Sequence, residues 1–246
     1  YGGNKGRFAS ILKAWYGDAA TSPNFAYEYL PKVEGDHSHI AIAEATDKGI
    51  IKGLISPGHN TAVSGPNANL ERVGLGKLDW LVVADLWETE TSAFWKPKDP
   101  NNPNADCLSS PGVKTRDIKT EVFLLPAKAS MEKEGSITNS GRWMQWRYKC
   151  CDGPAMVKSD LWIWTKIVQK VKELYATEGG EYPDPITSLT WDYGNEPDVH
   201  KVAKEINGYD LKTGRLLPSF SKLKDDGTTT SGKWLYCASY TEDGNM

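Results

Sequence analysis

Three apolar runs of the sequence each lead to a polar side chain that could bind a ligand. These side chains are Asn60, Asp85 and Lys133. The Asn60 amide could donate to and accept from a phosphate, a ribose or a ring edge, and the Asp85 carboxylate matches two N–H donors of guanine. The lysine ammonium suits phosphate or a polar ring edge. Ligands of open α/β sheets bind outside the carboxyl ends of the strands, so the three side chains are expected to meet in one crevice.

The elements that must position these side chains are three strands, expected at 50–56, 80–85 and 121–126. The second run has the continuous leucine and valine content of a strand that is buried on both faces. Helices are expected at 38–48, 67–77, 88–95 and 159–179, with Ser38 as an N-cap and Gly49 as a left-handed C-cap. This alternation predicts an α/β fold with a mostly parallel sheet and flanking helices.

The rest of the chain is expected to be less regular. Short helices are expected at 9–15 and 199–206, a ligand-wrapping loop at 132–147 and a strand at 233–237. The chain therefore divides into an irregular segment 1–37, an α/β domain 38–180 and a loop-rich extension 181–246. It starts at Tyr1 without an initiator Met and stops without a terminating element, so both ends are expected to be cuts inside a longer chain.

Composition narrows the class of protein. The chain has 246 residues and 39% apolar content, which is enough for the core of a soluble globular protein. Its net charge of -3 creates no field for a polyanion, so nucleic acid is not an expected partner. No run approaches the ~18 apolar residues of a membrane span, so no transmembrane segment is expected in this chain. The four cysteines lack the spacing of a zinc, dithiol or iron–sulfur site, and Cys150 and Cys151 are expected to be half-buried thiols.

Each candidate side chain also has a simpler structural explanation. Asn60 could close an Asx turn, and Asp85 could cap the following helix. Lys133 stands between two glutamates that would hold it by ion pairing, and most such lysines are simply solvated. Asp160 would lie in the first turn of a helix, where the helix dipole alone favours an acid.

Other polar and aromatic residues are weaker functional candidates. His59 has no second histidine or carboxylate at ligand spacing, so this chain is expected to hold no metal ion by itself. Arg142, Trp143 and Trp146 could line an access path or contact another subunit, but packing explains them better in a chain with ten tryptophans. No residue of the chain is assigned a catalytic role.

Four stretches of the sequence form a recognisable set. They are 58–60 with 64–67, 78–85 with 88–91, 132–147, and 159–162. Together they resemble the large subunit of the molybdopterin oxidoreductase family, and they are most similar to periplasmic and membrane-associated formate dehydrogenases. The resemblance covers most of 9–175, although Thr61 stands where the family usually has proline.

The resemblance implies an α/β layer that forms one wall of a bis-molybdopterin guanine dinucleotide site holding Mo or W. It implies cofactor contacts from Gly58, His59, Asn60, Ala84, Asp85, Lys133 and Asp160, with the backbone of Ala84 and the two aspartates facing guanosine. The formate dehydrogenases of this family interconvert formate and CO2 and pass electrons through [4Fe-4S] clusters to an iron–sulfur subunit. Their metal ligand, catalytic His and Arg, and cluster cysteines lie upstream of this region, and the domain that completes the second dinucleotide site lies downstream. The chain is therefore expected to be an internal fragment or split piece of a periplasmic large subunit, with the remaining segments as partners.

Two alternative functions stay open at this point. One is another substrate within the same family, such as nitrate or polysulfide. The other is a non-catalytic carbohydrate-binding module, because ten Trp and eleven Tyr could build aromatic platforms for sugars. Such modules are usually antiparallel with alternating strands, whereas the strands expected here are continuous apolar runs.

Overall fold

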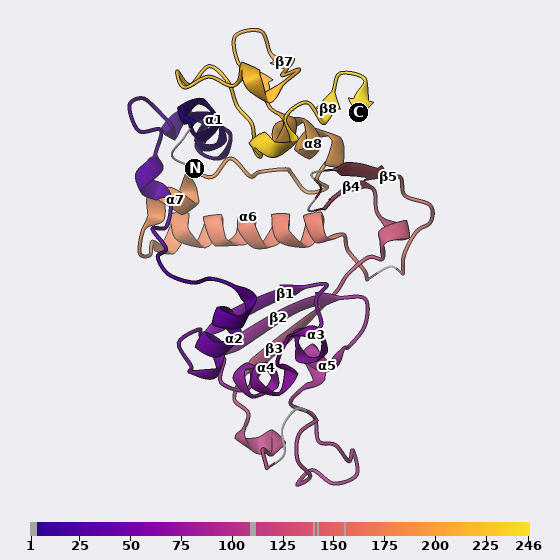
Figure 1. Cartoon of the computed structure of the whole chain (residues 1–246). Coiled ribbons are helices and arrows are strands. Elements are labelled where there is room, and N and C mark those ends of the chain that lie inside the picture. The colour runs from indigo at the N-terminus through magenta and orange to yellow at the C-terminus, as the bar shows by residue number, and fades with distance from the viewer. Residues whose placement is uncertain (1–3, 109–111, 140, 142, 155) are drawn as a thin grey trace. The chain divides into compact units, whose positions relative to one another are not determined.

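The computed structural model describes residues 4–108, 112–139, 141, 143–154 and 156–246 (Figure 1). These residues form two compact units. Unit 1 comprises the described residues of 1–32, 130–152 and 161–246, and unit 2 comprises those of 33–129 and 153–160. Each unit has its own secondary structure and its own buried core.

Unit 2 contains a three-stranded parallel sheet in the order β1-β2-β3 (Figure 1). Strand β1 spans Gly53–Pro57, β2 spans Trp80–Asp85 and β3 spans Glu121–Pro126. Pro57 pairs with Ala84, and Asp85 pairs with Pro126, so the carboxyl ends of the three strands are level. The predicted α/β fold with a parallel sheet is confirmed.

Helices precede and connect these strands. They are α2 (His39–Asp47), α3 (Thr61–Ser64), α4 (Ala68–Leu75), α5 (Glu90–Ala93) and the 3₁₀ turn η3 (Thr115–Asp117). Of these, α2, α4 and α5 lie close to where the sequence predicts them, whereas α3 and η3 were not predicted as helices. The Ser38 side chain accepts a hydrogen bond from the Ala41 N–H at the start of α2. Gly49, just past the end of α2, has a φ of 67°, which is the left-handed conformation that glycine adopts without strain.

The first strand begins later than the sequence predicts. The N–H groups of Ile50 and Ile51 donate to the Ala45 carbonyl at 2.9 and 3.4 Å, so both residues complete the end of α2 instead of joining the sheet. Gly53 then opens β1 against the ring of Trp80, because a Cβ at position 53 would lie 2.1 Å from that ring. The missing side chain at Gly53 thus lets the Trp80 ring lie across β1.

The core of unit 2 lies on one face of the sheet. Leu81 and Val83 are fully buried there and pack with apolar side chains of the neighbouring helices and turns, namely Ala62, Leu75, Leu78 and Phe94. On the opposite face, Ile55 and Phe123 flank Val82 in register and are 40% and 44% exposed. On this second face of β2, Ala84 is 2% exposed but Trp80 is 40% exposed, so the expectation that β2 is buried on both faces holds only in part.

Unit 1 combines helices with short antiparallel hairpins. Its helical elements are α1 (Lys5–Tyr16), η1 (Gly17–Ala19), η2 (Tyr27–Tyr29), η4 (Ser130–Glu132), α6 (Asp160–Glu178, whose first residue is assigned to unit 2), α7 (Pro183–Thr187), α8 (Val199–Asn207), η5 (Phe220–Lys222) and η6 (Trp234–Tyr236). Its hairpins pair β4 (Gly135–Thr138) with β5 (Met144–Arg147), β6 (Tyr209–Asp210) with β7 (Arg215–Leu216), and β8 (Tyr240–Thr241) with β9 (Gly244–Asn245). The predicted helices at 9–15, 159–179 and 199–206 are confirmed, with α1 longer than expected.

The core of unit 1 fixes α1 on two sides. Leu12 and Tyr16 pack against the segment that follows α1, at Ala20, Phe25 and Ala26. The Ser10 hydroxyl lies 2.8 Å from the Thr229 hydroxyl, and the Ser231 N–H donates to the Ser10 carbonyl at 3.1 Å. The C-terminal segment therefore packs beside α1.

Two sequence-based predictions for unit 1 are wrong. The segment 132–147, expected as a loop, contains the β4–β5 hairpin, because its Ile, Thr and Trp residues favour strands despite the surrounding Gly and Ser. The segment 233–237, expected as a strand, contains the turn η6. The N–H groups of Gly232 and Lys233 bond to the carbonyls of Glu205 and Ile206 in α8, and these bonds turn the chain.

The boundaries of the two units differ from those of the three segments expected from the sequence. Most of α6 belongs to unit 1, whereas the sequence groups it with the α/β domain 38–180. The assignment of 38–180 as a dinucleotide-binding domain stays a prediction.

Candidate functional site

The carboxyl edge of the sheet in unit 2 gathers the candidate residues of the first two strand ends. Gly58, His59 and Asn60 follow β1, while Ala84 and Asp85 close β2. The Gly58 N–H donates to the Ala84 carbonyl at 2.8 Å, which fastens the turn after β1 to the neighbouring strand. These five residues therefore lie at one edge of the sheet, as predicted from the order of the strands.

Asp160 lies close to the end of β3. Ala127, the residue after β3, forms a parallel bridge with Lys158. The Lys158 N–H donates to Pro126 O at 3.2 Å, and the Lys128 N–H donates to Lys158 O at 2.9 Å. Asp160 follows Lys158 by two residues and begins α6. The segment before α6 thus continues the edge of the sheet beyond β3.

The Asn60 side chain clamps the turn after β1 to the start of α5. Its Oδ1 accepts from Thr91 N at 3.2 Å and from Thr91 Oγ1 at 2.8 Å, and its Nδ2 donates to Glu90 Oε2 at 2.6 Å. Thr91 is fully buried, and its Oγ1 accepts in turn from the Ala62 N–H at 3.1 Å. Both lone pairs of the Asn60 amide oxygen are therefore used, which leaves one amide N–H for a ligand.

The pKa of the Glu90 carboxylate depends on its hydrogen bond with Asn60. The hydrogen bond from the Asn60 amide is the largest of the effects that lower the pKa of Glu90. Because the pKa of Glu90 is lower in the folded chain, Glu90 contributes to the stability of the fold above its unfolded pKa of about 4.3. This contribution is lost as the pH falls through the folded pKa. We expect Asn60→Ala to raise the Glu90 pKa toward its ordinary value in an NMR titration of the carboxyl carbon. An unchanged Glu90 pKa in that variant would contradict the clamp.

The Asp85 carboxylate caps the turn that follows β2 and keeps acceptor capacity. Its Oδ1 accepts from the Leu86 N–H at 2.8 Å, and its Oδ2 accepts from the Thr89 hydroxyl at 3.4 Å. Each oxygen of an ionised carboxylate has a second lone pair, so two further N–H donors can be accepted. The capping role and a role in binding guanine are therefore compatible at Asp85.

His59 borders a cavity of 370 Å³ beside β1, with further walls from α2 and α4. Its ring lies 5.7 Å from the ring of His39 in an edge-on arrangement, and its Nε2 lies 3.5 Å from the Ser64 hydroxyl. Across the described ranges, no group of three or more His, Cys, Asp or Glu side chains is arranged to hold a metal ion. The polar groups beside the His59 ring are the Ser64 hydroxyl and the His39 imidazole.

Glu71 is a buried acid near this edge that sequence reasoning missed. Its side chain is 4% exposed, its Oε2 lies 3.3 Å from His39 Nε2, and the Thr61 hydroxyl donates to the same oxygen. Its Oε1 has no partner among the described residues and occupies the space that a side chain at Gly65 would need. Glu71 thus holds Thr61, the residue next to Asn60. The available signal was the glycine in the stretch 64–67, since glycine allows such a close approach.

Lys133 is the candidate that lies outside unit 2. It belongs to unit 1, so its convergence with Asn60 and Asp85 stays a prediction. It directly precedes Glu134, one of the two glutamates expected to hold it. The contacts of Glu134 therefore describe the surroundings of the residue next to Lys133.

Glu134 belongs to a cluster that joins the β4–β5 hairpin to α8 and β8. Its Oε1 accepts from Trp146 Nε1 at 3.1 Å and lies 3.1 Å from His200 Nε2. The other ring nitrogen of His200, Nδ1, lies 2.5 Å from the hydroxyl of Tyr240, which is 5% exposed. Burial is the largest cause that raises the pKa of Tyr240, so its hydroxyl stays protonated at neutral pH and can donate to His200. His200 Nε2–H then donates to Glu134.

Removal of the His200 ring is expected to weaken this cluster. We expect His200→Ala to lower the free energy of unfolding by about 1–3 kcal/mol, because the buried Tyr240 hydroxyl loses its partner. Chemical denaturation of the chain measures this change. His37→Ala is the matched control, since the ring of His37 bonds to the Glu34 carbonyl of its own exposed loop. Equal stabilities of the His200→Ala variant and the parent chain would contradict the structural role of the cluster.

The aromatic candidates near this hairpin differ in exposure. Trp146 stacks on His200 with 4.9 Å between ring centroids, which supports packing as its role. Trp143 is 69% exposed and presents its ring to solvent. Arg142 lies outside the described residues, so its proposed place on an access path stays a prediction.

Two further predictions concern the cysteines and membrane-spanning helices. Cys150 and Cys151 are exposed free thiols, so the expectation that they are half-buried is wrong. Cys107 and Cys237 are buried free thiols. Within the part of the chain that the structure describes, no helix combines the length and apolar character needed to cross a bilayer.

Comparison with curated proteins finds relatives along nearly the whole chain. The chain is 42% identical over 251 residues to formate dehydrogenase 2 subunit alpha (cytochrome c-553) of Nitratidesulfovibrio vulgaris Hildenborough, an alignment that covers 96% of this chain. It is 39% identical over 254 residues to the nitrate-inducible formate dehydrogenase major subunit of Escherichia coli K12, and 40% identical over 259 residues to formate dehydrogenase subunit alpha of Megalodesulfovibrio gigas, with 97% of the chain covered in both. The chain spans about a quarter of the length of these relatives, 23% to 24%. No protein-family profile matches the chain.

Proposed function

We propose that this chain supplies one wall of a bis-molybdopterin guanine dinucleotide site holding Mo or W. The reason is that the chain is homologous to one segment of formate dehydrogenase alpha and major subunits, which are molybdopterin oxidoreductases. In the assembled enzyme this site serves the oxidation of formate to CO2 or the reverse reaction. The proposed partners are the other segments of the large subunit and an iron–sulfur subunit, with [4Fe-4S] clusters carrying the electrons. The proposed location is the periplasm.

The observation that carries this proposal is the carboxyl edge of the parallel sheet in unit 2. Asp85 closes β2 there, between the turn 58–60 after β1 and the segment 158–160 beside the end of β3. A carboxylate with two unused lone pairs and an amide with one unused N–H are suited to the donor and acceptor pattern of a guanine nucleotide. The donor set therefore fits the guanosine end of the cofactor.

The residues of this chain bind and orient the cofactor in this proposal. Asp85 accepts two N–H groups of guanine while it keeps its bond to the Leu86 N–H. Asn60 holds the turn and offers its remaining N–H to a phosphate or ribose oxygen. Lys133 supplies positive charge to a phosphate or to the pterin edge. When bound, the cofactor supplies the redox chemistry of formate, and no catalytic residue is assigned to this chain.

The four remaining proposed contacts with the cofactor are chemically less specific. Gly58 and His59 border the same turn, Ala84 offers its backbone, and Asp160 carries a carboxylate beside the end of β3. Asp160 also stands at the start of α6, where the helix dipole favours an acid. Cofactor binding and dipole stabilisation are compatible at this position.

Elemental and nucleotide analysis of the assembled enzyme tests the proposal. We expect stoichiometric Mo or W together with guanosine monophosphate released by acid hydrolysis. An assembled complex without metal and guanine nucleotide, but with retained glycan binding, would overturn it in favour of a carbohydrate-binding module. The parallel sheet argues against that module, because such modules are usually antiparallel. Turnover of nitrate or polysulfide in place of formate would identify the other alternative within the family.

A further inference from the structure

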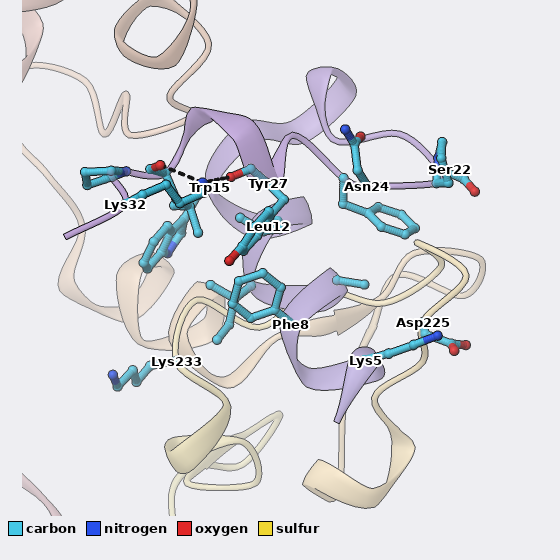
Figure 2. A pocket seen from close by; sticks show the side chains of 16 residues that line it. Lys5, Phe8, Leu12, Trp15, Ser22, Asn24, Tyr27, Lys32, Asp225 and Lys233 are labelled. Carbon is cyan, nitrogen blue, oxygen red and sulfur yellow. Dashed lines mark hydrogen bonds between the residues drawn. The ribbon is translucent and has the colours of Figure 1, made fainter. Parts of the chain in front are cut away.

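Unit 1 contains a groove that none of the proposed cofactor contacts lines. It has a volume of 840 Å³ and lies between α1 and the segment 22–32, with Asp225 and Lys233 from the C-terminal part of the chain at its margin (Figure 2). We call it the α1 groove. Its size is typical of a specific binding site rather than of a packing defect, because packing defects rarely exceed the volume of a water molecule.

The walls of the α1 groove are mainly apolar and aromatic. Phe8 and Tyr27 face each other with 5.3 Å between ring centroids, and Leu12 is buried in the wall of α1 (Figure 2). Tyr27 is nevertheless 47% exposed. Apolar surface of this kind gains free energy when a partner covers it, so the groove is suited to apolar side chains of another segment.

The charged residues around the α1 groove are mostly positive. Three lysines, Lys5, Lys32 and Lys233, line it with a single carboxylate, Asp225. The Lys32 ammonium is fixed by the carbonyls of Tyr27 and Leu30, at 2.6 and 2.8 Å. Lys5 and Lys233 are exposed at this groove. This local charge contrasts with the net charge of -3 of the chain and favours a partner that carries carboxylates.

We propose that the α1 groove binds an apolar segment with acidic residues from another part of the large subunit. The relatives are about four times as long as the matched segment, so most of the surface available to cover this groove lies outside it. Apolar side chains of the partner fill the space beside Phe8 and Tyr27, and its carboxylates pair with Lys5 and Lys233. The inference rests on the proposed function only for the identity of the partner.

Zero-length carbodiimide cross-linking of the assembled enzyme tests this assignment. We expect peptides in which Lys5 or Lys233 is joined to an Asp or Glu from a segment of the large subunit outside these 246 residues. Cross-links only to a second copy of the large subunit, or only to a different subunit, would overturn the choice of partner. Metal and guanine nucleotide are measured on the same sample, so a failure of the proposed function is seen separately from a failure of the docking assignment.

An absence of cross-links from both lysines would overturn the pairing with partner carboxylates, and two further measurements test the docking by other means. Hydroxyl-radical labelling of the assembled enzyme should leave Tyr27 unmodified and modify Tyr182, which is 77% exposed in the same unit. The double variant Lys5→Glu with Lys233→Glu should lower the yield of assembled enzyme about tenfold, because like charges in an interface repel. Lys201→Glu with Lys212→Glu, at exposed lysines of unit 1 outside the groove, is the matched control and should assemble normally. Equal labelling of both tyrosines, or equal yields of both double variants, would overturn the proposal.

Discussion

Replacement of Asp85 by alanine is expected to weaken the binding of pterin guanine dinucleotide to the assembled enzyme roughly 150- to 20,000-fold. Two charge-assisted hydrogen bonds from guanine would be lost, and a hydrogen bond to a charged group contributes about 1.5–3 kcal/mol. Guanosine monophosphate released by acid hydrolysis, together with Mo or W content, measures the effect. Full cofactor occupancy in Asp85→Ala would refute the role of Asp85 in binding guanine.

Asp85 also caps the turn after β2, so a second variant must separate binding from folding. Asp85→Asn keeps an oxygen for the Leu86 N–H but places an amide NH₂ where guanine presents its own donors. We expect it to lose the cofactor nearly as strongly as Asp85→Ala while its stability stays close to that of the parent. Asp79→Ala is the control, because Asp79 is an exposed acid at the opposite end of β2. Cofactor loss in the Asp79→Ala variant equal to that in Asp85→Ala would point to a general charge effect.

Replacement of Asn60 by alanine is expected to lower the free energy of unfolding of the chain by about 2–4 kcal/mol. The loss is large because the N–H and the hydroxyl of Thr91 both donate to the Asn60 amide oxygen, and Thr91 has no exposure to water. Chemical denaturation of the chain measures the change. A denaturation midpoint equal to that of the parent would contradict the clamp.

Two variants refine the test of Asn60. Ser64→Ala removes an exposed hydroxyl that donates to the Asn60 carbonyl and should change stability little. Asn60→Asp keeps an acceptor for Thr91 but loses the donor to Glu90 and places two carboxylates together. We expect Asn60→Asp to be intermediate at low pH, where the carboxyls are protonated, and to be less stable at neutral pH, where they repel. A stability of Asn60→Asp that does not depend on pH would argue against direct contact with Glu90.

The parts of the fold that local signals determine were predicted well. The strand β2 and the start of α2 follow from a continuous apolar run and from a capping serine, both of which act within a few residues of the chain. The level carboxyl ends of β1, β2 and β3 then follow from the parallel order, which placed Asn60 and Asp85 at one edge. β2 and the start of α2 could be read from the sequence because they depend on neighbours in the chain, and the order of the strands follows from the alternation of strands and helices.

The features that were missed depend on contacts between distant residues. The bond between Asn60 and Thr91 spans 31 positions, and it changes the role of Asn60 from a local turn residue to a clamp. The turn η6 forms where a strand was expected, because α8 supplies acceptors for the N–H groups of Gly232 and Lys233. Neither partner carries a local signal in the sequence. Prediction therefore failed where a side chain or an N–H group could choose among several partners.

A structure of the assembled enzyme with its cofactor tests the central claim most directly, through the distances from the Asp85 carboxylate oxygens to N1 and N2 of guanine. The claim predicts hydrogen bonds of about 2.7–3.2 Å, with the Asn60 N–H and the Lys133 ammonium turned toward the same cofactor. A guanine bound elsewhere, beyond hydrogen-bonding reach of Asp85, would contradict it.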